Sequence, residues 1–302
     1  MASVQGDKAG SDERADDSSS GPRPNLNETE ATPTGGKPAA WGLAPVLSIV
    51  IPVYNEVGTL GRILVEVAKA LPEVAKQIVI VDDNSIDGTS DWLRNNLSRA
   101  NRSWRRLSLN GGGNLEFCAD SPADHAEISF TVLFHERNRS KGAAVRTGLT
   151  SVWGDVIVIQ DADLEYDPND WGLMLPLIVE RKVADVVYGS RFYGRPHRSL
   201  YFHHYIANRL ISVLFNLLYN QMLSDIEACY KMFSREVLNH LTLTSEDFGI
   251  EIEISAQIAR RRRWRIYEVG ISYYGRTYEE GKKINWRDGL KALFYLFQFR
   301  IS

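Results

Sequence analysis

The chain has 302 residues, of which 44% are hydrophobic and 24% are charged, which is the composition of an ordinary globular protein rather than a fibrous one. A formal net charge of -3 and a pI near 6.1 argue against general nucleic-acid binding. The two cysteines, Cys118 and Cys229, form no metal-ligand spacing and favour a reducing compartment.

Residues 1–44 are predicted to be a disordered tail. Ser, Asp, Gly, Pro and Thr dominate this segment, and it contains no apolar run of the kind found in a secretory signal. No later stretch reaches the roughly 20 apolar residues that a transmembrane helix needs. These features predict a cytoplasmic chain, in solution or peripheral on the cytoplasmic face of a membrane.

The next segments alternate between short aliphatic runs and helical periodicity. Val46 to Val53 is almost unbroken β-branched and aliphatic, as in a strand buried on both faces of a parallel sheet, and residues 57–71 then have helical spacing. Further strands are predicted at 77–81, 130–134, 156–159 and 183–187, with helices near 89–97, 142–153 and 170–179. The pattern indicates an α/β fold with a doubly wound, mostly parallel, Rossmann-like sheet. Such sheets bind ligands beyond the carboxyl ends of their strands.

Two regions depart from this alternation. Residues 99–126 are polar and lack a period, so we interpret them as an insertion of unknown use. Beyond Gly189 we expect helices at 200–223 and 248–263, a strand at 264–274 and an amphipathic, aromatic-rich ending at 286–299. From Val186 onward Lys and Arg outnumber Asp and Glu, so anionic partners are expected there. The helix at 200–223 suits either a buried core or an anionic membrane surface.

Asp161-Ala162-Asp163 follows directly on the predicted strand at 156–159. Hard divalent cations such as Mg2+ or Mn2+ bind carboxylate oxygens and usually share their coordination with substrate phosphates. Glu165 offers a further oxygen two residues on. An Asp-x-Asp turn on its own is more often a solvated acidic turn, so the surrounding motifs decide between the two interpretations.

Three further motifs stand at predicted strand ends. The sequence Pro-Val-Tyr-Asn-Glu occupies 52–56, Val-Asp-Asp-Asn-Ser-Ile-Asp-Gly-Thr occupies 81–89, and Gly-Ser-Arg-Phe occupies 189–192. With these motifs in this order the chain resembles family 2 glycosyltransferases over 47–283, and within them the dolichol-phosphate and polyprenyl-phosphate mannosyltransferases and hexosyltransferases. The resemblance implies a GT-A fold with C-terminal amphipathic helices. It implies a catalytic domain at 45–275, then a basic acceptor loop and amphipathic helix at 276–302.

The resemblance also implies residue roles. It places the nucleoside against Pro52, Tyr54, Glu56, Val81 and Asp83, where a tyrosine ring can stack and carboxylates can accept hydrogen bonds. It places the metal and diphosphate at Asp161, Ala162 and Asp163, with Glu165 as a further metal ligand where relatives often carry Gln.

The resemblance places phosphate-binding cations at Arg191, Arg276 and Lys282, which with Asp163 form the predicted catalytic set. Such cations offset the charge that builds on a departing diphosphate. The Glu279-Glu280-Gly281 stretch leaves the choice between Lys282 and Lys283 open.

The activity implied is inverting transfer of a hexose to a polyprenyl or dolichyl phosphate, with GDP-mannose favoured over UDP-glucose as the donor and Mg2+ or Mn2+ as the cofactor. A lipid phosphate arrives ionised, whereas a hydroxyl acceptor needs a general base. Four carboxylates are candidate bases, each equally suited to a salt bridge or a cap: Asp225, Glu227, Glu246 and Asp247. A family 2 enzyme with a sugar hydroxyl acceptor therefore stays open, as does a non-catalytic scaffold that binds sugar nucleotides. A Rossmann dehydrogenase is disfavoured because no glycine fingerprint follows the first strand.

Overall fold

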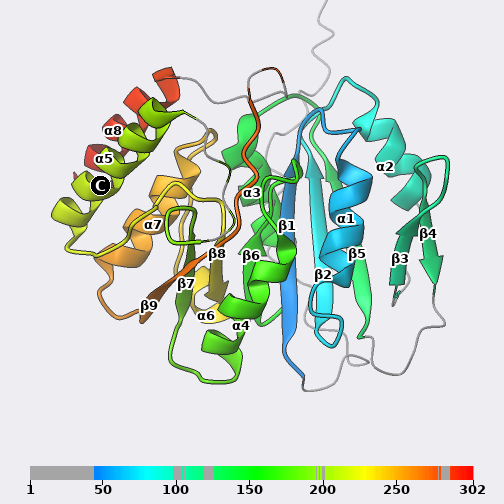
Figure 1. The fold of residues 1–302 in the computed structure, drawn as a ribbon, viewed down its shortest axis with the longest axis horizontal. Helices are drawn as coiled ribbons and strands as arrows, with labels where there is room; N and C mark the ends of the chain where they lie inside the picture. Colours follow the sequence, from blue (N-terminus) through cyan, green and yellow to red (C-terminus); the bar gives the residue numbers. More distant parts are fainter. Residues whose placement is uncertain are drawn as a thin grey trace, which may run out of the picture. The chain divides into compact units, whose positions relative to one another are not determined.

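The aliphatic run at Val46–Val53 forms strand β1, near the middle of a seven-stranded sheet (Figure 1). The computed structural model describes residues 44–97, 104, 106–118, 126–194, 196, 198, 201–277, 279 and 286–301. The other strands of this sheet are β2 (Ala75–Asp82), β5 (Ile128–Phe134), β6 (Val156–Ile159), β7 (Val186–Ser190), β8 (Lys231–Ser234) and β9 (Ile266–Gly270). They are arranged in the order β5-β2-β1-β6-β8-β7-β9.

The sheet is mostly parallel, as predicted. Strand β1 pairs in parallel with β2 and with β6, β2 pairs in parallel with β5, and β7 pairs in parallel with β9. Strand β8 is the exception, because it runs antiparallel to both β6 and β7. The sequence did not predict this short strand, which is buried at the centre of the sheet.

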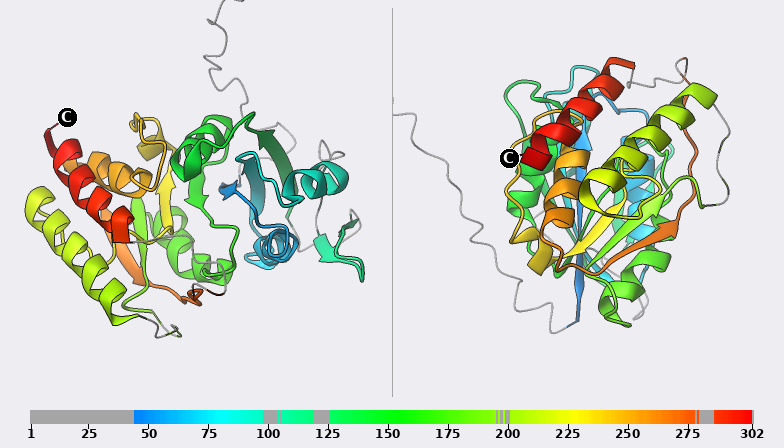
Figure 2. Two further views of the ribbon diagram at one scale, coloured as in Figure 1. Left: turned by 90° about the horizontal axis from the view of Figure 1, so that it is seen from above. Right: turned by 90° about the vertical axis from the view of Figure 1, so that its left-hand side faces the viewer.

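Helices cover both faces of the sheet (Figures 1 and 2). On one face lie α1 (Leu60–Lys69) and α4 (Trp171–Val179), and on the other lie α3 (Ser140–Ser151) and α7 (Ile250–Arg260). Helices α5 (Phe202–Tyr219) and α8 (Trp286–Ile301) lie side by side and pack against α7. The smaller elements are α2 (Thr89–Leu97), the 3-10 turn η2 (Pro168–Asp170) and α6 (Arg235–Leu238). The predicted helices exist; α2 has the predicted bounds, and the bounds of the others differ by a few residues.

The predicted insertion contains a β-hairpin. Strands β3 (Arg106–Leu109) and β4 (Leu115–Cys118) pair antiparallel around a turn in which Asn110 Oδ1 accepts hydrogen bonds from the backbone N–H of Gly112 and Asn114, both at 3.0 Å. Leu109 packs against Gly61, where a Cβ atom would stand only 3.1 Å from its side chain. The hairpin therefore covers part of α1 rather than forming an unstructured loop.

Several predictions fall outside the described residues. The tail predicted at 1–44 lies outside them except for Ala44, and Lys282 and Lys283 lie outside them as well. In the part of the chain that the structure does describe, every helix is too short or too polar to span a bilayer.

Candidate active site at the carboxyl edge of the sheet

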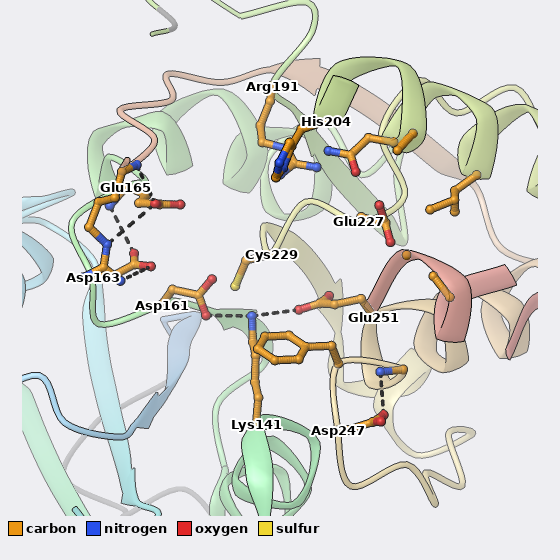
Figure 3. Close-up of a pocket in the computed structure, with 18 of the residues that line it drawn as sticks. Lys141, Asp161, Asp163, Glu165, Arg191, His204, Glu227, Cys229, Asp247 and Glu251 are labelled. Carbon is orange, nitrogen blue, oxygen red and sulfur yellow. Dashed lines mark hydrogen bonds and ion pairs between the residues drawn. The ribbon is translucent and has the colours of Figure 1, made fainter. Parts of the chain in front are cut away.

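The loops that follow β1, β2, β6 and β7 meet at one edge of the sheet because these strands run in the same direction. The antiparallel β8 begins at this edge, so the segment before it joins the same group of loops. A cavity of about 1120 Å³ lies here (Figure 3). Its walls include most of the predicted site residues, namely Pro52, Tyr54, Glu56, Asp83, Asp161, Ala162, Asp163, Glu165, Arg191 and Arg276.

Asp161 is held by a buried row of alternating charges. Lys141, in the first turn of α3, places its Nζ 2.8 Å from Asp161 Oδ1 and 3.2 Å from Glu251 Oε1. The other oxygen of Glu251 lies 2.6 Å from the Nζ of Lys231, whose side chain is fully buried. Because ion pairs are strong where water is excluded, this row fixes the direction of the Asp161 carboxylate.

Asp163 contacts Arg276 instead. Arg276 Nη2 lies 3.1 Å from Asp163 Oδ2 and 3.2 Å from Glu56 Oε1, so one guanidinium joins the loop after β6 to the loop after β1. Glu165 adds to this junction: its Oε1 accepts from the backbone N–H of Arg276 at 2.7 Å, and its Oε2 accepts from the Tyr273 hydroxyl at 3.0 Å. Both oxygens of Glu165 thus bind the C-terminal segment in this structure.

The carboxylates of the acidic pair Asp161 and Asp163 lie in a region where negative charge exceeds the positive charge of the nearby lysine and arginine. Burial, together with the nearby charges of Asp161 and Glu165, raises the pKa of Asp163 to about 7 even though Arg276 lowers it. Over the described residues, no group of three or more His, Cys, Asp or Glu side chains is placed to hold a metal ion by itself. Two adjacent carboxylates with surplus charge fit a hard divalent ion that completes its coordination with phosphate oxygens.

The predicted nucleoside residues divide into two groups. Pro52, Tyr54 and Asp83 line the cavity with Glu56, whereas Val81 is fully buried within β2 and does not line it. Asp83 is almost fully buried and forms part of the loop framework, because its Oδ1 lies 2.6 Å from His135 Nδ1. The backbone N–H of Arg139 donates to the same oxygen at 2.9 Å.

The neighbouring acids of this loop have capping roles. Asp87 accepts from the backbone N–H of Thr89 at 3.0 Å and of Val57 at 3.1 Å, and Asp82 accepts from the hydroxyls of Ser85 and Ser90. Asp82 and Asp87 are therefore turn and cap residues of this loop.

Arg191 and Asp225 form a buried bidentate ion pair. Arg191 Nε and Nη2 each lie 2.7 Å from one oxygen of Asp225, and the backbone N–H of Arg191 donates to the same carboxylate at 3.1 Å. Asp225 is completely buried, whereas Arg191 lines the cavity. Asp225 therefore fixes the orientation of the arginine and has no free oxygen for another role.

The remaining candidate bases differ in their surroundings. Glu246 is exposed and pairs with Arg139, and Asp247 accepts from the Tyr295 hydroxyl and pairs with Lys291. Glu227 lines the cavity and makes no hydrogen bond or ion pair with any residue that the structure describes. Burial raises the pKa of Glu227 to about 7, with Arg191 lowering it and Asp225 raising it.

Sequence reasoning missed Lys141 and Glu251. Lys141 lies in α3, which precedes strand β6 and Asp161 in the chain. Glu251 lies in α7, most of whose residues are buried in the core. Burial of a charged residue would have identified both positions, because charged residues are rarely buried without a partner. The sequence alone does not reveal burial at either position.

Comparison with known proteins agrees with this architecture. The sequence matches the model of the family described as Glycosyl transferase family 2 over residues 48–108 and 118–242. The chain belongs to glycosyltransferase family 2. Its fold is GT-A, as the resemblance implied.

Relatives within the family include polyprenyl-phosphate enzymes. Undecaprenyl-phosphate mannosyltransferase of Micrococcus luteus is 29% identical over 77% of this chain and 85% of its own length. The glycosyltransferase AglJ of Haloferax volcanii is 26% identical over 70% of this chain, which spans only 58% of that relative. Glucosyl-3-phosphoglycerate synthase of Mycobacterium tuberculosis, solved with Mn2+, UDP and phosphoglyceric acid, superposes with a TM-score of 0.59 at 16% identity, over 86% of this chain and 80% of that one.

Proposed function

We propose that this family 2 glycosyltransferase moves a hexose from a nucleotide diphosphate sugar to a polyprenyl or dolichyl phosphate, with inversion at the anomeric carbon. The observation that carries the proposal is the cavity, which joins Asp161 and Asp163 to apolar side chains of α5 and α8, among them Phe202, Leu210 and Leu293. A reaction between a polar sugar nucleotide and a lipid with a long apolar chain needs a cavity that has both a polar wall and an apolar wall.

On the donor side, Asp161 and Asp163 would hold Mg2+ or Mn2+, and a bound ion of this kind would stabilise the charge of the leaving diphosphate. Tyr54 and Glu56 lie at the nucleoside end. Arg276 now neutralises Asp163 and Glu56, so donor binding requires it to exchange a carboxylate for a phosphate. The name of the mannosyltransferase among the relatives supports mannose as the transferred sugar, and GDP-mannose is therefore the donor we propose ahead of UDP-glucose.

On the acceptor side, Arg191 is the central cation. Asp225 holds its Nε and Nη2, and Nη1 makes no hydrogen bond with a described residue, so that nitrogen can donate to a phosphate. Arg276 and Lys282 would complete the phosphate site. An ionised lipid phosphate placed here attacks the anomeric carbon without a base, and positioning supplies most of the acceleration.

The outer faces of α5 and α8 suit contact with a membrane at its cytoplasmic surface. Exposed apolar residues recur along α5 at helical spacing: Phe202, Ile206, Leu210, Val213 and Leu217. On α8 the exposed apolar residues are Phe294, Phe297 and Ile301. The helices α5 and α8 lie side by side (Figure 2), so the two rows belong to neighbouring helices, and Phe202 and Leu210 of the first row also line the cavity.

Glu227 favours a second candidate function, transfer to a sugar hydroxyl. It is the one candidate base whose carboxylate is in the cavity and unpaired among the described residues, so it could accept the proton of a hydroxyl acceptor. The apolar wall of the cavity has no role in that reaction, which is why we prefer the lipid phosphate.

The test is an incubation of the protein with Mn2+, GDP-mannose or UDP-glucose, and a polyprenyl phosphate, followed by mass spectrometry of the lipid fraction. The proposal predicts a glycosylated lipid phosphate, and none from Asp163→Asn. Donor consumption that depends on a sugar hydroxyl acceptor would favour the second candidate. Nucleotide-sugar binding without turnover of any acceptor would favour the non-catalytic scaffold.

A further inference from the structure

One section of the cavity wall has no role in the reaction so far. It lies between the acidic pair and the apolar helices and carries Lys141, Glu227, Cys229 and Glu251 (Figure 3). Cys229 and Glu227 come from the segment before β8, while Glu251 comes from α7 and Lys141 from α3. Three separate parts of the chain therefore converge on this section.

Two carboxylate groups on this wall have unused acceptor capacity. Glu227 is half-buried, lines the cavity and makes no hydrogen bond or ion pair with a described residue. Glu251 is only 5% exposed, and its Oε1 makes no hydrogen bond even though Lys141 Nζ stands 3.2 Å away. Glu251 Oε1 shares its one cationic neighbour with Asp161, and Glu227 faces the open cavity, so both can accept hydrogen bonds from a ligand that supplies donors.

The charge of this section restricts what that ligand is. Glu227 and Glu251 add two carboxylates beside Asp161, against the two lysines Lys141 and Lys231. A phosphate placed here would meet like charge in a poorly solvated site. Arg276 pairs with Asp163 and Glu56 rather than with the carboxylates of this section, and the charge of Arg191 is offset by Asp225, so this section suits a neutral ligand rich in hydroxyl groups.

We propose that Glu227 binds hydroxyl groups of the transferred sugar, with Oε1 of Glu251 as a second acceptor on the same wall. This inference rests on the proposed function for the presence of a sugar nucleotide, and it assigns Glu227 to the transferred sugar rather than to the acceptor hydroxyl of the second candidate function. A carboxylate accepts two hydrogen bonds from neighbouring hydroxyls, so the arrangement also makes this wall a determinant of which hexose is taken.

The experiment compares the affinities of nucleotides and nucleotide sugars by calorimetry, without any acceptor. UDP, UDP-glucose, GDP and GDP-mannose are each titrated with Mn2+ into the wild type, Glu227→Ala and Glu227→Gln. Glu246→Ala is the matched control, because it removes an exposed carboxylate outside this wall. Retained nucleotide binding shows that each variant is folded.

For the nucleotide sugar that the wild type accepts, Glu227→Ala should lower the affinity about tenfold or more, since a hydrogen bond to a charged group is lost. The nucleotide alone should change less than twofold, and Glu227→Gln should lie between. Equal changes for nucleotide and nucleotide sugar, or no change for either, would overturn the inference. Unaltered sugar binding with kcat lost in both variants would also overturn it and make Glu227 a base.

The failure of the proposed function looks different. A wild type that binds a nucleotide sugar but makes no glycolipid would refute the lipid phosphate acceptor, while the effect of Glu227→Ala on donor affinity would still be measured and would still decide this inference.

Discussion

Replacing Asp225 with Asn tests the buried ion pair that orients Arg191. Asp225 has 0% exposure and accepts from three N–H groups of Arg191. The Asn side chain is of nearly the same size, so the change removes the charge and half of the acceptor capacity without opening a cavity. The guanidinium, whose side chain is 13% exposed, would then stand in the protein without its counter-charge.

The expected loss is large. Breaking a buried pair by removing one partner destabilises a protein by about 3–5 kcal/mol. For a domain of this size each kcal/mol shifts Tm by about 2–4 °C, which makes the decrease roughly 6–20 °C. Because folded domains are stable by only about 5–15 kcal/mol, this single pair accounts for a substantial share.

Thermal unfolding followed by circular dichroism measures the effect. Asp185→Asn is the matched control, since Asp185 makes the same bidentate contact with Arg265 at 2.7 and 3.0 Å, but Arg265 is 54% exposed. The control should shift Tm by much less, because water screens exposed pairs. Equal decreases of Tm in Asp225→Asn and Asp185→Asn would refute the explanation that burial makes the Arg191–Asp225 pair strongly stabilising. The double variant Arg191→Met with Asp225→Leu should recover part of the loss.

Four further predictions concern the site and its surroundings. Asp163→Asn should lower nucleotide-sugar turnover in Mn2+ about a hundredfold or more, and turnover within tenfold of the wild type would contradict its role at the diphosphate. The pKa of Glu227 is raised from 4.5 to about 7, so the folded state binds more protons between these values and this group destabilises the fold increasingly as pH rises through them. Glu227→Gln should therefore raise Tm more at pH 8 than at pH 5, and a pH-independent difference would exclude this origin. Gly142→Ala should destabilise by about 1–3 kcal/mol in urea, because its Cβ would stand 2.6 Å from the carbonyl oxygen of Asp247, whereas Gly58→Ala has nothing within 4 Å and should not. Leu210→Ser with Leu217→Ser should reduce co-sedimentation with anionic vesicles severalfold; the exposed polar pair Glu236→Gln and Arg263→Gln is the control, and equal binding by all three proteins would count against the membrane-facing surface.

Strands β1, β2 and β6 of the parallel half of the sheet were predictable because they are buried on both faces. Each of these three strands contains a run of Ile and Val residues, and the residues that follow these strands give the order of the site motifs. Strand β8 escaped prediction because it has four residues and begins with a charged one. Lys231 is buried only because Glu251, twenty positions away, compensates its charge.

The hairpin of β3 and β4 escaped for a related reason. Each strand has four residues and buries few of them, so neither produces a clear alternation. Site residues that directly follow a strand were predictable from the sequence. Ion pairs between residues of different loops were not. Arg276 was predicted as a phosphate ligand, and its three carboxylate neighbours come from loops that only the folded sheet brings together.

The reversed direction of β8 has a consequence for how this enzyme could diversify. The segment leading into β8 reaches the cavity from the side opposite to β1 and β2, and it carries Asp225, Glu227 and Cys229 within five positions. The loops after β1 and β2 make no contact with that segment through hydrogen bonds or ion pairs between described residues. In the proposed function the loops after β1 and β2 bind the nucleoside, so a library randomised at Glu227 and its neighbours, with Asp225 kept because it holds Arg191, would explore new sugars and acceptors without changing those loops.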